Sequence, residues 1–589
     1  MRRSRIRWSA PLIAFAVLLA IPVAATPQQT QAESTAVGTG GAAATVDVLA
    51  TRAAVEALRG GANAVDAAVV AAAVLGVVEP FSCGIGGGGF MVIRTSDGTV
   101  TTIDHRETAP AAMKPDSFFE GPDPLAFDAA RFSGLSVGVP GTVRGWDEAL
   151  RRYGTMSLAE ALRPAIGVAR EEFLVDQIFF NQTQANVDFF DDIPSTRALY
   201  LDPDGTPRDI GTVFRNPDMA RTYERIAHLG AKGFYRGAVA DAMVAAVQTP
   251  PVAPDANHIW RAGLMTMRDV KGYVAPERAP TRVGYRGLDV YSMGPPSSGG
   301  STVGESLNIL EGFGLGPADR TQALHLFLEA SRFSFADRNA YLADADFFDV
   351  PLTGLLSDGF AAERRGLIDP QQAATSPVAP GNPYPYNMAE QASTAAVTTD
   401  GTTTHLTVSD RRGNVVAYTF TIESIGGNGV VVPGWGFLLN NELTDFNFDS
   451  LTHPNRVEGG KRPRSSMSPT IVLDDGEPLL ALGTPGGSTI ITVVLEILVE
   501  RLDLGAMLPQ AIAAPRATQR NTATTLAEPA FASSPEGQAL AAQYGHRFSL
   551  TSEIGAATGI EFLAGGRVLA AAEPVRRGGG SAMVEEPEP

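Results

Sequence analysis

The sequence predicts an α/β protein in which layers of helices cover antiparallel strands. Helical spacing rich in alanine occupies residues 46–58 and 64–77, and amphipathic helical runs dominate the middle of the chain. After residue 403 the pattern turns to pairs of alternating strands joined by tight turns. Because such hairpins are antiparallel, they argue against a doubly wound parallel sheet.

Each element has its own local signal. Residues 90–94 are a strand that follows a glycine-rich run, and Ser157 with Glu160 forms a capping box that opens a helix. Further amphipathic runs in the middle of the chain predict additional helices. The strand pairs are separated by Gly413, by Asp475 with Gly476, and by Gly565 with Gly566. The expected helices cover residues 301–310, 321–342, 359–368 and 489–499, and the expected strand pairs cover residues 405–410 with 414–419, 470–473 with 479–482 and 560–563 with 568–571.

Composition and charge restrict the class of protein. A chain of 589 residues with 44% hydrophobic content can bury a large core, and its length alone suggests several domains. The net charge of −18 argues against nucleic acid or an anionic membrane as a partner. The single cysteine, Cys83, cannot form an intrachain disulfide and is expected to be a small buried side chain.

The N-terminus has the pattern of a secretory signal. Residues 1–8 are basic, residues 10–20 are apolar, and residues 22–25 are small at the positions that a signal peptidase reads. The apolar run is shorter than the roughly 20 residues that a bilayer span needs, and no later segment offers one. We therefore expect residues 1–25 to be removed and the mature protein to be periplasmic or extracellular, without a membrane span.

A threonine run marks the point where the chain is expected to cut itself. Residues 369–402 are rich in proline and small residues, which predicts an exposed, mobile segment, and a strand follows at once. If the peptide bond before a hydroxyl residue breaks here, that residue supplies both a nucleophilic oxygen and a freed amine as base. On chemistry alone, Thr402, Thr403 and Thr404 are all candidates. The plainer interpretation is a threonine-rich loop leading into a hairpin.

Two other patterns are weaker. The run from Gly84 to Gly89 satisfies the dinucleotide-binding spacing, with Asp104 about twenty residues later. However, it follows a helical stretch and precedes a strand, which inverts the order that a dinucleotide fold requires. The histidines show no metal-ligand spacing, so His105 and His405 are expected to be local hydrogen-bond partners rather than ligands.

Eight short motifs in a fixed order resemble the γ-glutamyltransferase (γ-glutamyl transpeptidase) family of N-terminal nucleophile hydrolases. Each motif is weak alone, but all eight occur in the family's order, and the resemblance covers the chain from about residue 37 to residue 580. The motifs are NAVDAA at 63–68, CGIGGGGF at 83–90, DHRETAP at 104–110, VPGT at 139–142, TTH at 403–405, LLNNELTDF at 438–446, KRPRSSMSP at 461–469 and GTPGGS at 483–488.

The resemblance implies a four-layer αββα sandwich built from two products of one precursor. Residues 26–402 would form the large subunit and residues 403–589 the small subunit, paired in one intertwined domain. Thr403 is the implied nucleophile, because the family's catalytic threonine is followed directly by Thr-His. Its hydroxyl would attack the Thr402 carbonyl during maturation and the substrate carbonyl during turnover. No cofactor or metal is implied.

The same resemblance assigns the remaining site residues. Thr421 matches the threonine that orients the nucleophile, and Gly486 and Gly487 match the oxyanion donors. The implied binders of the substrate α-carboxylate are Arg106, Ser465 and Ser466, and those near its ammonium are Glu442 and Asp445.

The chain departs from the family pattern at two places. Glu423 stands where the best-known members have asparagine and adds a third carboxylate near the expected ammonium. Residues 446–464 are shorter than in members with a lid loop, which predicts an open acceptor side.

The resulting hypothesis is an exported γ-glutamyltransferase that cleaves glutathione and related γ-glutamyl amides through an acyl-threonine ester. The acyl group would pass to water, amino acids or peptides. Two alternatives stay open. One is a glutaryl (cephalosporin) acylase or poly-γ-glutamate-cleaving relative, which the open acceptor side and Glu423 favour. The other is an inactive, unprocessed binding protein, which the Glu423 departure also suggests.

Overall fold

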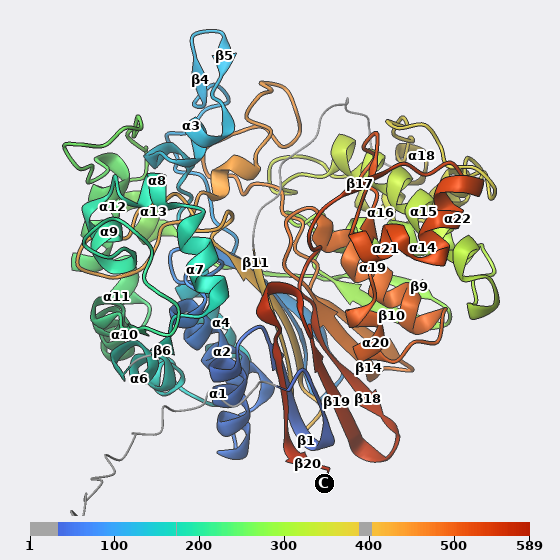
Figure 1. Ribbon diagram of the computed structural model, residues 1–589, viewed down its shortest axis with the longest axis horizontal. Coiled ribbons are helices and arrows are strands. Elements are labelled where there is room, and N and C mark those ends of the chain that lie inside the picture. Colours follow the sequence, from blue (N-terminus) through green and yellow to red (C-terminus); the bar gives the residue numbers. More distant parts are fainter. Residues whose placement is uncertain (1–32, 172, 388–402, 589) are drawn as a thin grey trace, which may run out of the picture.

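A single path of hydrogen-bonded antiparallel strands runs through the centre of the molecule (Figure 1). The structure, a computed structural model, describes residues 33–171, 173–387 and 403–588. In spatial order the path is β8 (Glu277–Arg278), β3 (Val100–Asp104), β2 (Gly88–Arg94), β12 (Val415–Thr421), β11 (Thr403–Ser409), β1 (Thr35–Thr45), β19 (Arg567–Ala572), β18 (Thr558–Leu563), β14 (Glu477–Gly483), β13 (Thr470–Asp474), β10 (Leu288–Ser292) and β9 (Thr281–Tyr285), with β20 (Ser581–Pro587) paired to β1.

Strand β1 divides this path into two sheets that stack face to face. Residues 42–44 of β1 pair with β11, whereas residues 35–39 pair with β19. Across the stack, β11 and β12 pack against β14, and β11 packs against β18. Glycine also lets β20 (Ser581–Pro587) approach β1 closely: a Cβ added at Gly38 would lie 2.1 Å from the Glu586 carbonyl oxygen. The glycine- and alanine-rich composition of β1 therefore suits the joint between the sheets.

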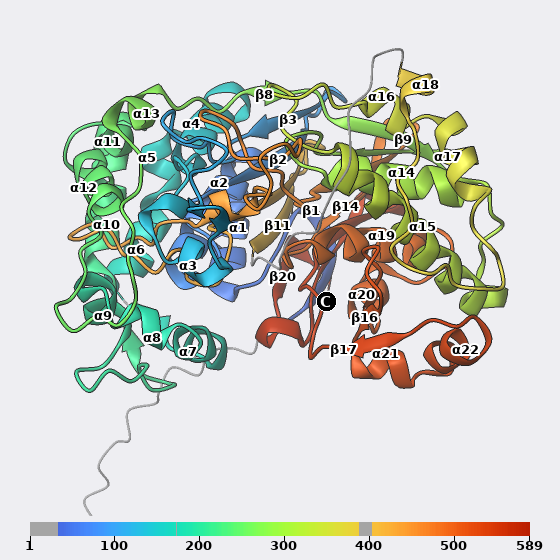
Figure 2. The ribbon, with the colours of Figure 1, turned by 90° about the horizontal axis from the view of Figure 1, so that it is seen from above.

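Helices cover both outer faces and complete the predicted αββα sandwich (Figures 1 and 2). On one side α1 (Val48–Arg59), α2 (Ala64–Val78) and α4 (Thr142–Tyr153) pack on the sheet that holds β11 and β12. On the other side α14 (Gly299–Glu311), α19 (Thr489–Leu502) and α20 (Leu508–Ala513) pack on the second sheet, with α15 (Arg320–Tyr341) against α14. Every residue of α2 is buried, and a capping box between Asn63 and Asp66 starts it.

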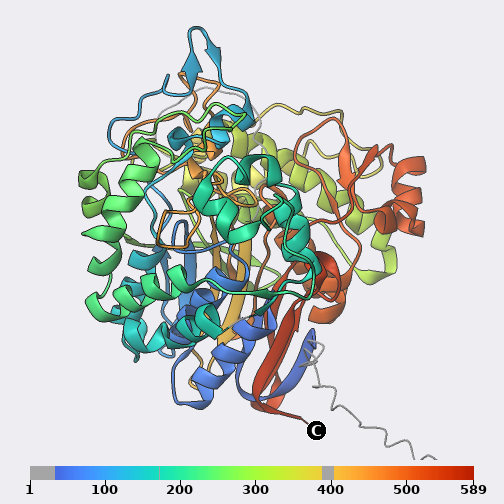
Figure 3. The same ribbon diagram turned by 60° about the vertical axis from the view of Figure 1, so that its left-hand side comes forward.

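Smaller elements surround these layers. The β4–β5 hairpin projects from the body in Figure 3. The remaining elements are α3 (Phe127–Arg131), α5 (Leu158–Ala161), α6 (Arg163–Glu171), α7 (Gln177–Gln184), α8 (Val187–Phe190), α9 (Pro194–Tyr200), α10 (Pro217–Leu229), α11 (Lys232–Tyr235), α12 (Ala238–Gln248), α13 (Met267–Gly272), α16 (Leu352–Leu355), α17 (Asp358–Arg365), α18 (Tyr384–Asn387), α21 (Pro529–Ser533), α22 (Pro535–Gln543), β4 (Phe119–Glu120), β5 (Asp123–Pro124), β6 (Phe173–Leu174), β7 (Val213–Phe214), β15 (Ala517–Thr518), β16 (Thr525–Ala527), β17 (Phe548–Leu550) and short 3-10 turns η1 (Gly134–Ser136), η2 (Pro317–Asp319), η3 (Glu442–Asp445), η4 (Ala564–Gly566) and η5 (Arg576–Gly578).

The β11–β12 hairpin has the predicted position and places two threonines side by side. Its register pairs Ser409 with Val415 near the turn and Thr403 with Thr421 at the open end. Asp410 fixes the turn, because its carboxylate accepts hydrogen bonds from the backbone N–H groups of Arg412 and Asn414. The first residue of β11 therefore lies at the end of the sheet.

The segment after residue 369 is more ordered than the sequence predicted. Up to Asn387 it is tied to the body: the Asn521 side chain bonds both the N–H and the carbonyl of Val378, and Ala374 N donates to Glu329. Tyr384 is buried. As predicted, residues 369–387 are exposed or partly buried, with Pro383 and Tyr384 as buried exceptions. However, distant side chains bind the backbone and tie the segment to the body, which the sequence did not predict.

Several other expectations concern the chain ends and Cys83. Cys83 is buried and free, as predicted. Within the described residues, no helix combines the length and apolar character of a membrane span. The expected signal (residues 1–25) and Thr402 lie outside the described residues.

Candidate active site

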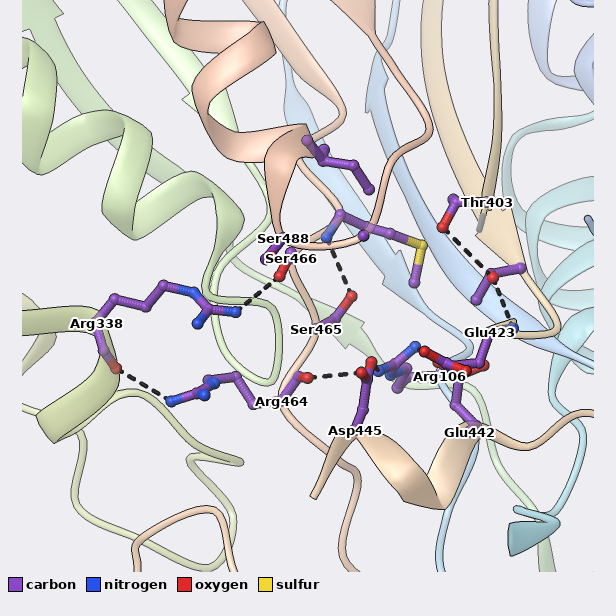
Figure 4. A pocket seen from close by; sticks show the side chains of 14 residues that line it. Arg106, Arg338, Thr403, Glu423, Glu442, Asp445, Arg464, Ser465, Ser466 and Ser488 are labelled. Carbon is purple, nitrogen blue, oxygen red and sulfur yellow. Dashed lines mark hydrogen bonds and ion pairs between the residues drawn. The ribbon is translucent and has the colours of Figure 1, made fainter. Parts of the chain in front are cut away.

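One pocket, of about 370 Å³, opens where β11 and β12 end (Figure 4). It brings together nearly all the residues selected from the motifs, although these are spread over more than 350 positions of the chain. Its lining consists of Arg106, Arg338, Thr403, Thr421, Glu423, Glu442, Asp445, Arg464, Ser465, Ser466, Met467, Gly487, Ser488 and Ile490. Gly486 is the one selected residue that does not line it.

Thr403 and Thr421 face each other at the base of the pocket. Thr403 is 4% exposed, and its hydroxyl lies 3.4 Å from the Thr421 hydroxyl oxygen. That oxygen also accepts a hydrogen bond of 2.8 Å from the backbone N–H of Glu423. Thr421 is thus held in place, with its hydroxyl oxygen positioned to accept a hydrogen bond from the Thr403 hydroxyl. A spacing of 3.4 Å is typical of catalytic contacts before substrate binds.

Strand alternation distinguishes Thr403 from Thr404. Neighbouring side chains of a strand point to opposite faces, so Thr404 points away from the pocket that Thr403 lines. Within the described part of the chain, the buried Thr404 hydroxyl has no hydrogen-bond partner. His405 shares the Thr403 face and bonds the hydroxyls of Thr419 and Thr407. Burial lowers its pKa to about 3, so this imidazole is neutral.

The glycine turn before α19 presents free backbone donors. Gly486 has a φ of 135° and Gly487 a φ of 57°, conformations that favour glycine. Their carbonyls accept the first bonds of α19, from Thr489 N and Ile490 N. Among the described residues, neither glycine N–H has a hydrogen-bond acceptor. The positive end of the α19 dipole adds to these donors, which suits a developing oxyanion.

Arg106 is held by two carboxylates. Its side chain is 1% exposed and pairs with Glu442 and Asp445. Burial alone would lower its pKa, but these carboxylates outweigh burial and raise it. Glu107 lies beside them, and burial raises its pKa to about 7. Both Glu107 oxygens lack a donor among the described residues, and so does the Glu442 Oε2 atom. Burial also raises the pKa of Glu442, which favours a proton within this pair of carboxyl groups.

A side chain on α15 positions one of the two neighbouring serines, Ser465 and Ser466. The Nη2 atom of Arg338, on α15, donates a 2.7 Å bond to the Ser466 hydroxyl oxygen (Figure 4). Ser466 must then direct its own hydroxyl hydrogen elsewhere, and the pocket lies on its open side. Ser465 accepts from Met467 N at 3.1 Å, while Ser298 binds the Ser465 carbonyl.

Glu423 is strained and buried. Its φ is 78°, it is 3% exposed, and its carboxylate accepts hydrogen bonds from Ser424 and Asn441. Burial, followed by the charge of Asp445, raises its pKa to about 7. The pocket lining thus holds three carboxyl groups, of Glu423, Glu442 and Asp445, and three guanidinium groups, of Arg106, Arg338 and Arg464. This combination suits a ligand that carries both a cation and an anion.

Some functional neighbours were not selected from the sequence. Glu107 had only its position next to Arg106 as a signal, and Arg338 had none, because it lies 128 residues from Ser466. The glycine run has a packing role: a Cβ at Gly87 would lie 1.9 Å from the Thr421 carbonyl oxygen. His105 was expected to be a hydrogen-bond partner, but neither of its ring nitrogens has one among the described residues.

Two histidines that are far apart in the sequence lie together in the structure, which the search for metal-ligand spacing did not predict. His325, Glu329 and His546 lie close enough to share a metal ion and are buried. However, the imidazoles bond each other at 2.9 Å, and Glu329 is committed to Arg332 and to Ala374 N. Among the described residues, the His546 Nδ1 atom has no hydrogen-bond partner, but the adjacent Arg332 guanidinium opposes a cation.

Comparisons with known proteins agree with this geometry. The family model for gamma-glutamyltranspeptidase matches residues 50–583. A glutathione hydrolase proenzyme of Pseudomonas sp. (strain A14) is 36% identical over 525 residues, which cover 86% of each chain. The acylase ACY 1 proenzyme of Pseudomonas sp. (strain SE83) is 35% identical over 509 residues, covering 84% of this chain and 85% of the acylase. The crystal structure of cephalosporin acylase from Bacillus halodurans has a TM-score of 0.82 at 27% identity, over 97% of this chain and 100% of the acylase.

Proposed function

We propose, because the chain belongs to the gamma-glutamyltranspeptidase family, that it matures by cleaving itself before Thr403 and then uses Thr403 as its nucleophile. The chain is an enzyme of this family, a γ-glutamyltransferase and glutathione hydrolase that acts on γ-glutamyl amides. The observation that carries the assignment of Thr403 is its place at the base of the pocket, in contact with Thr421.

Maturation and turnover use the same oxygen. In maturation the Thr403 hydroxyl adds to the Thr402 carbonyl, the peptide C–N bond breaks to leave an ester, and water hydrolyses that ester. The freed α-amine of Thr403 is then a base with a reference pKa near 8. In turnover it takes the hydroxyl proton as the oxygen attacks the γ-glutamyl carbonyl, and it returns the proton to the leaving amine. Water or an acceptor amine finally opens the acyl ester.

Negative charge that develops on the attacked carbonyl oxygen meets the donors of the glycine turn. The glycine turn at the start of α19 supports this assignment, because donors that are fixed before the reaction need little reorganisation. Each such donor contributes roughly 10²–10³-fold to the rate in comparable enzymes.

The pocket chemistry favours a γ-glutamyl group over a glutaryl group. We assign the substrate α-carboxylate to Arg106, Ser465 and Ser466, and the α-ammonium to Glu423 and Asp445, with Glu442 holding Arg106. A glutaryl group has no ammonium and would offer no cation to Glu423, which forms no ion pair with an arginine among the described residues. The likeness to acylases and the short segment of residues 446–464 still support an acylase as the second candidate.

The experiment compares two donors on the purified, processed enzyme. We expect release of glutamate from glutathione, and turnover of a glutaryl anilide at least tenfold slower than that of the matching γ-glutamyl anilide. Turnover of the glutaryl anilide without glutathione hydrolysis would reverse the assignment. A protein that stays unprocessed yet binds γ-glutamyl compounds would instead support the inactive alternative.

We also propose that residues 26–402 and 403–589 remain paired after the cut, and that residues 1–25 direct export. The strand path supports the pairing, since β11 lies between β1 and β12, so each subunit supplies strands to one sheet. N-terminal sequencing of both chains from the periplasm or medium tests both boundaries. Intracellular protein that retains residues 1–25 would contradict the export proposal.

A further inference from the structure

The arginines that line the pocket differ in whether the protein compensates their charge. Arg106 is compensated, because it pairs with Glu442 and Asp445. Arg338 and Arg464 also line the pocket, but among the described residues neither forms an ion pair with a carboxylate. The pocket therefore has two arginine charges for which the described part of the chain supplies no counterion.

Arg338 is buried on α15 and bonds neutral groups. Its Nη1 atom donates to the Asn339 side chain at 3.0 Å, and its Nε atom donates to Ser298 Oγ at 2.8 Å. Its Nη2 atom donates a 2.7 Å bond to Ser466 Oγ. Because the Ser466 oxygen accepts from a cation, its hydroxyl hydrogen remains available to a ligand in the pocket. Arg338 thus acts on a ligand through Ser466.

Arg464 is fixed at the end of the same helix. Its backbone N–H donates to Asn455 Oδ1 at 2.8 Å, and its Nη1 atom donates to the carbonyl oxygens of Arg338 and Leu342 at 3.3 and 3.4 Å. The negative end of the helix dipole favours a cation here. The Nη2 atom has no hydrogen-bond partner among the described residues, although Arg464 is 2% exposed. One donor of this buried guanidinium is therefore unused.

Two neighbouring guanidinium groups without a counterion cost free energy. Burial lowers the pKa of Arg464 to about 10, and burial together with the charge of Arg464 lowers the pKa of Arg338. Asp445 attracts both groups, but it is paired with Arg106. A guanidinium keeps its proton in proteins, so loss of a proton does not remove the repulsion. An anion carried by a ligand does remove it, and perturbed charges of this kind are typical of functional sites.

The uncompensated charges lie on opposite sides of the pocket (Figure 4). Arg338, Arg464 and Ser466 lie on one side. Glu423 lies on the other, and it forms no ion pair with an arginine among the described residues. This separation matches a zwitterionic ligand whose ammonium faces Glu423 and whose carboxylate faces the two arginines.

We propose that Arg338 and Arg464 supply the positive charge by which this pocket selects acyl groups that carry a carboxylate. The inference rests on the proposed function and deepens it. Arg106 adds hydrogen-bond donors to the same carboxylate, but its own charge is taken up by two protein carboxylates. Arg338 is a positioning residue that acts through Ser466, and Arg464 acts through its charge and its unused donor.

The proposal predicts which acyl groups depend on the two arginines. γ-Glutamyl and glutaryl groups both carry the carboxylate, so binding of both depends on the arginines. A 4-aminobutyryl group carries the ammonium but no carboxylate, so its binding depends on Glu423 and not on the arginines. Different residues therefore select the two charges of the donor, and each selection can be removed separately.

The test compares hydrolysis of γ-glutamyl-p-nitroanilide and 4-aminobutyryl-p-nitroanilide, which differ only in the α-carboxylate. We expect Arg464→Gln to raise the KM of the γ-glutamyl donor roughly tenfold, as for the loss of an interaction with a charged group. The KM of the 4-aminobutyryl donor should change less than about twofold by the same reasoning. Arg464→Lys keeps the charge and should retain part of the preference. Arg282→Gln, at an exposed ion pair, is the control and should change neither constant. Equal effects of Arg464→Gln on both donors would show that Arg464 only caps α15, and would overturn the proposal.

Inhibition constants give the same comparison if the 4-aminobutyryl donor turns over too slowly to measure. L-Glutamate and 4-aminobutyrate, as competitive inhibitors of the γ-glutamyl donor, also differ only in the α-carboxylate. The Ki of L-glutamate should rise roughly tenfold in Arg464→Gln, and that of 4-aminobutyrate should stay within about twofold. Parallel changes in the two constants would overturn the proposal.

Arg338 provides a second pair of variants if Arg464→Gln fails to mature. Arg338→Gln removes the charge and Arg338→Lys keeps it, so the preference for L-glutamate over 4-aminobutyrate should be lower in Arg338→Gln. Equal preferences in the two variants would overturn the proposal. A wild type that cleaves only the glutaryl anilide would overturn the proposed function instead. The comparison of glutaryl with butyryl anilide then decides the role of the two arginines by the same criterion.

Discussion

Replacing Glu423 by Gln should affect the free energy of unfolding and the binding of the donor in different ways. The substitution removes the destabilisation caused by burying an ionised carboxylate, and it also removes the charge proposed to bind the donor ammonium. In the folded protein its pKa is about 7, against an ordinary value of 4.5, because burial and Asp445 disfavour the charged form. Below pH 4.5 both the folded and the unfolded chains keep the proton, and stability is unaffected. Between pH 4.5 and 7 only the unfolded chain releases it, so the wild type progressively loses stability. The loss amounts to roughly 3 kcal/mol above pH 7, at 1.36 kcal/mol for each pKa unit.

Glutamine keeps the shape and the acceptor oxygen but cannot ionise. We therefore expect Glu423→Gln to raise the Tm above pH 7 and to leave it nearly unchanged below pH 5. The comparison belongs in a Thr403→Ala background, so that both proteins stay single chains. Ser424→Ala is a matched control: it removes one donor to the carboxylate, so it should raise the Glu423 pKa further. A Tm difference that does not grow with pH would refute this burial argument.

The same substitution should impair donor binding in the opposite pH range. Ionised Glu423 pairs with the donor ammonium, so Glu423→Gln should raise the donor KM by about tenfold at pH 8. At pH 6 wild-type Glu423 is mostly protonated, and the two enzymes should converge. At each pH the donor KM of Glu423→Gln is divided by that of the wild type. The Thr403 amine and the donor titrate in the same way in both measurements, so their effects on KM cancel in this ratio. A pH-independent ratio would show that Glu423 does not contact the ammonium.

Three further substitutions test the other parts of the site. Thr421→Val removes the acceptor for the Thr403 hydroxyl with little change in shape, so it should slow both self-cleavage and turnover at least tenfold by displacing the nucleophile; cleavage at the wild-type rate on denaturing gels would contradict this. Gly486→Ala puts a Cβ 2.6 Å from Thr489 Oγ1 at a φ of 135°, and should lower kcat by about 10²–10³ while changing the donor KM little; an unchanged kcat would exclude the oxyanion role. Arg106→Gln leaves buried Glu442 with an unpaired charge, and should cost about 3–5 kcal/mol in stability; a normal Tm would contradict the buried pair, and Arg106→Lys should recover part of it.

Much of the framework could be predicted from the sequence where local patterns are strong. The run that became α2 is alanine-rich with a capping box, and the hairpin of β11 and β12 alternates around a glycine turn. Strands β1 and β20 were not predicted. Glycine and alanine have low strand propensity, and β1 forms only because its partners β11, β19 and β20 arrive from the far end of the chain.

The site residues also fall into those that the sequence predicted and those that it did not. The residues taken from motifs share one pocket, apart from Gly486, because each motif carries its own local geometry. Arg338 and Arg577 had no such signal. Each is defined by the atom that it reaches, the Ser466 hydroxyl for one and the Thr403 carbonyl for the other. These contacts depend on how α15 and the η5 turn pack against the rest of the protein. The hydrophobic periodicity of the sequence does not predict that packing.

The most direct test of the account is the intact mass of the purified protein beside Thr403→Ala. The account predicts two chains in the wild type, with masses that place the cut between residues 402 and 403, and a single uncut chain in the variant. An uncut wild type, or a variant that is still cut at the same bond, would contradict the assignment of Thr403 as the nucleophile.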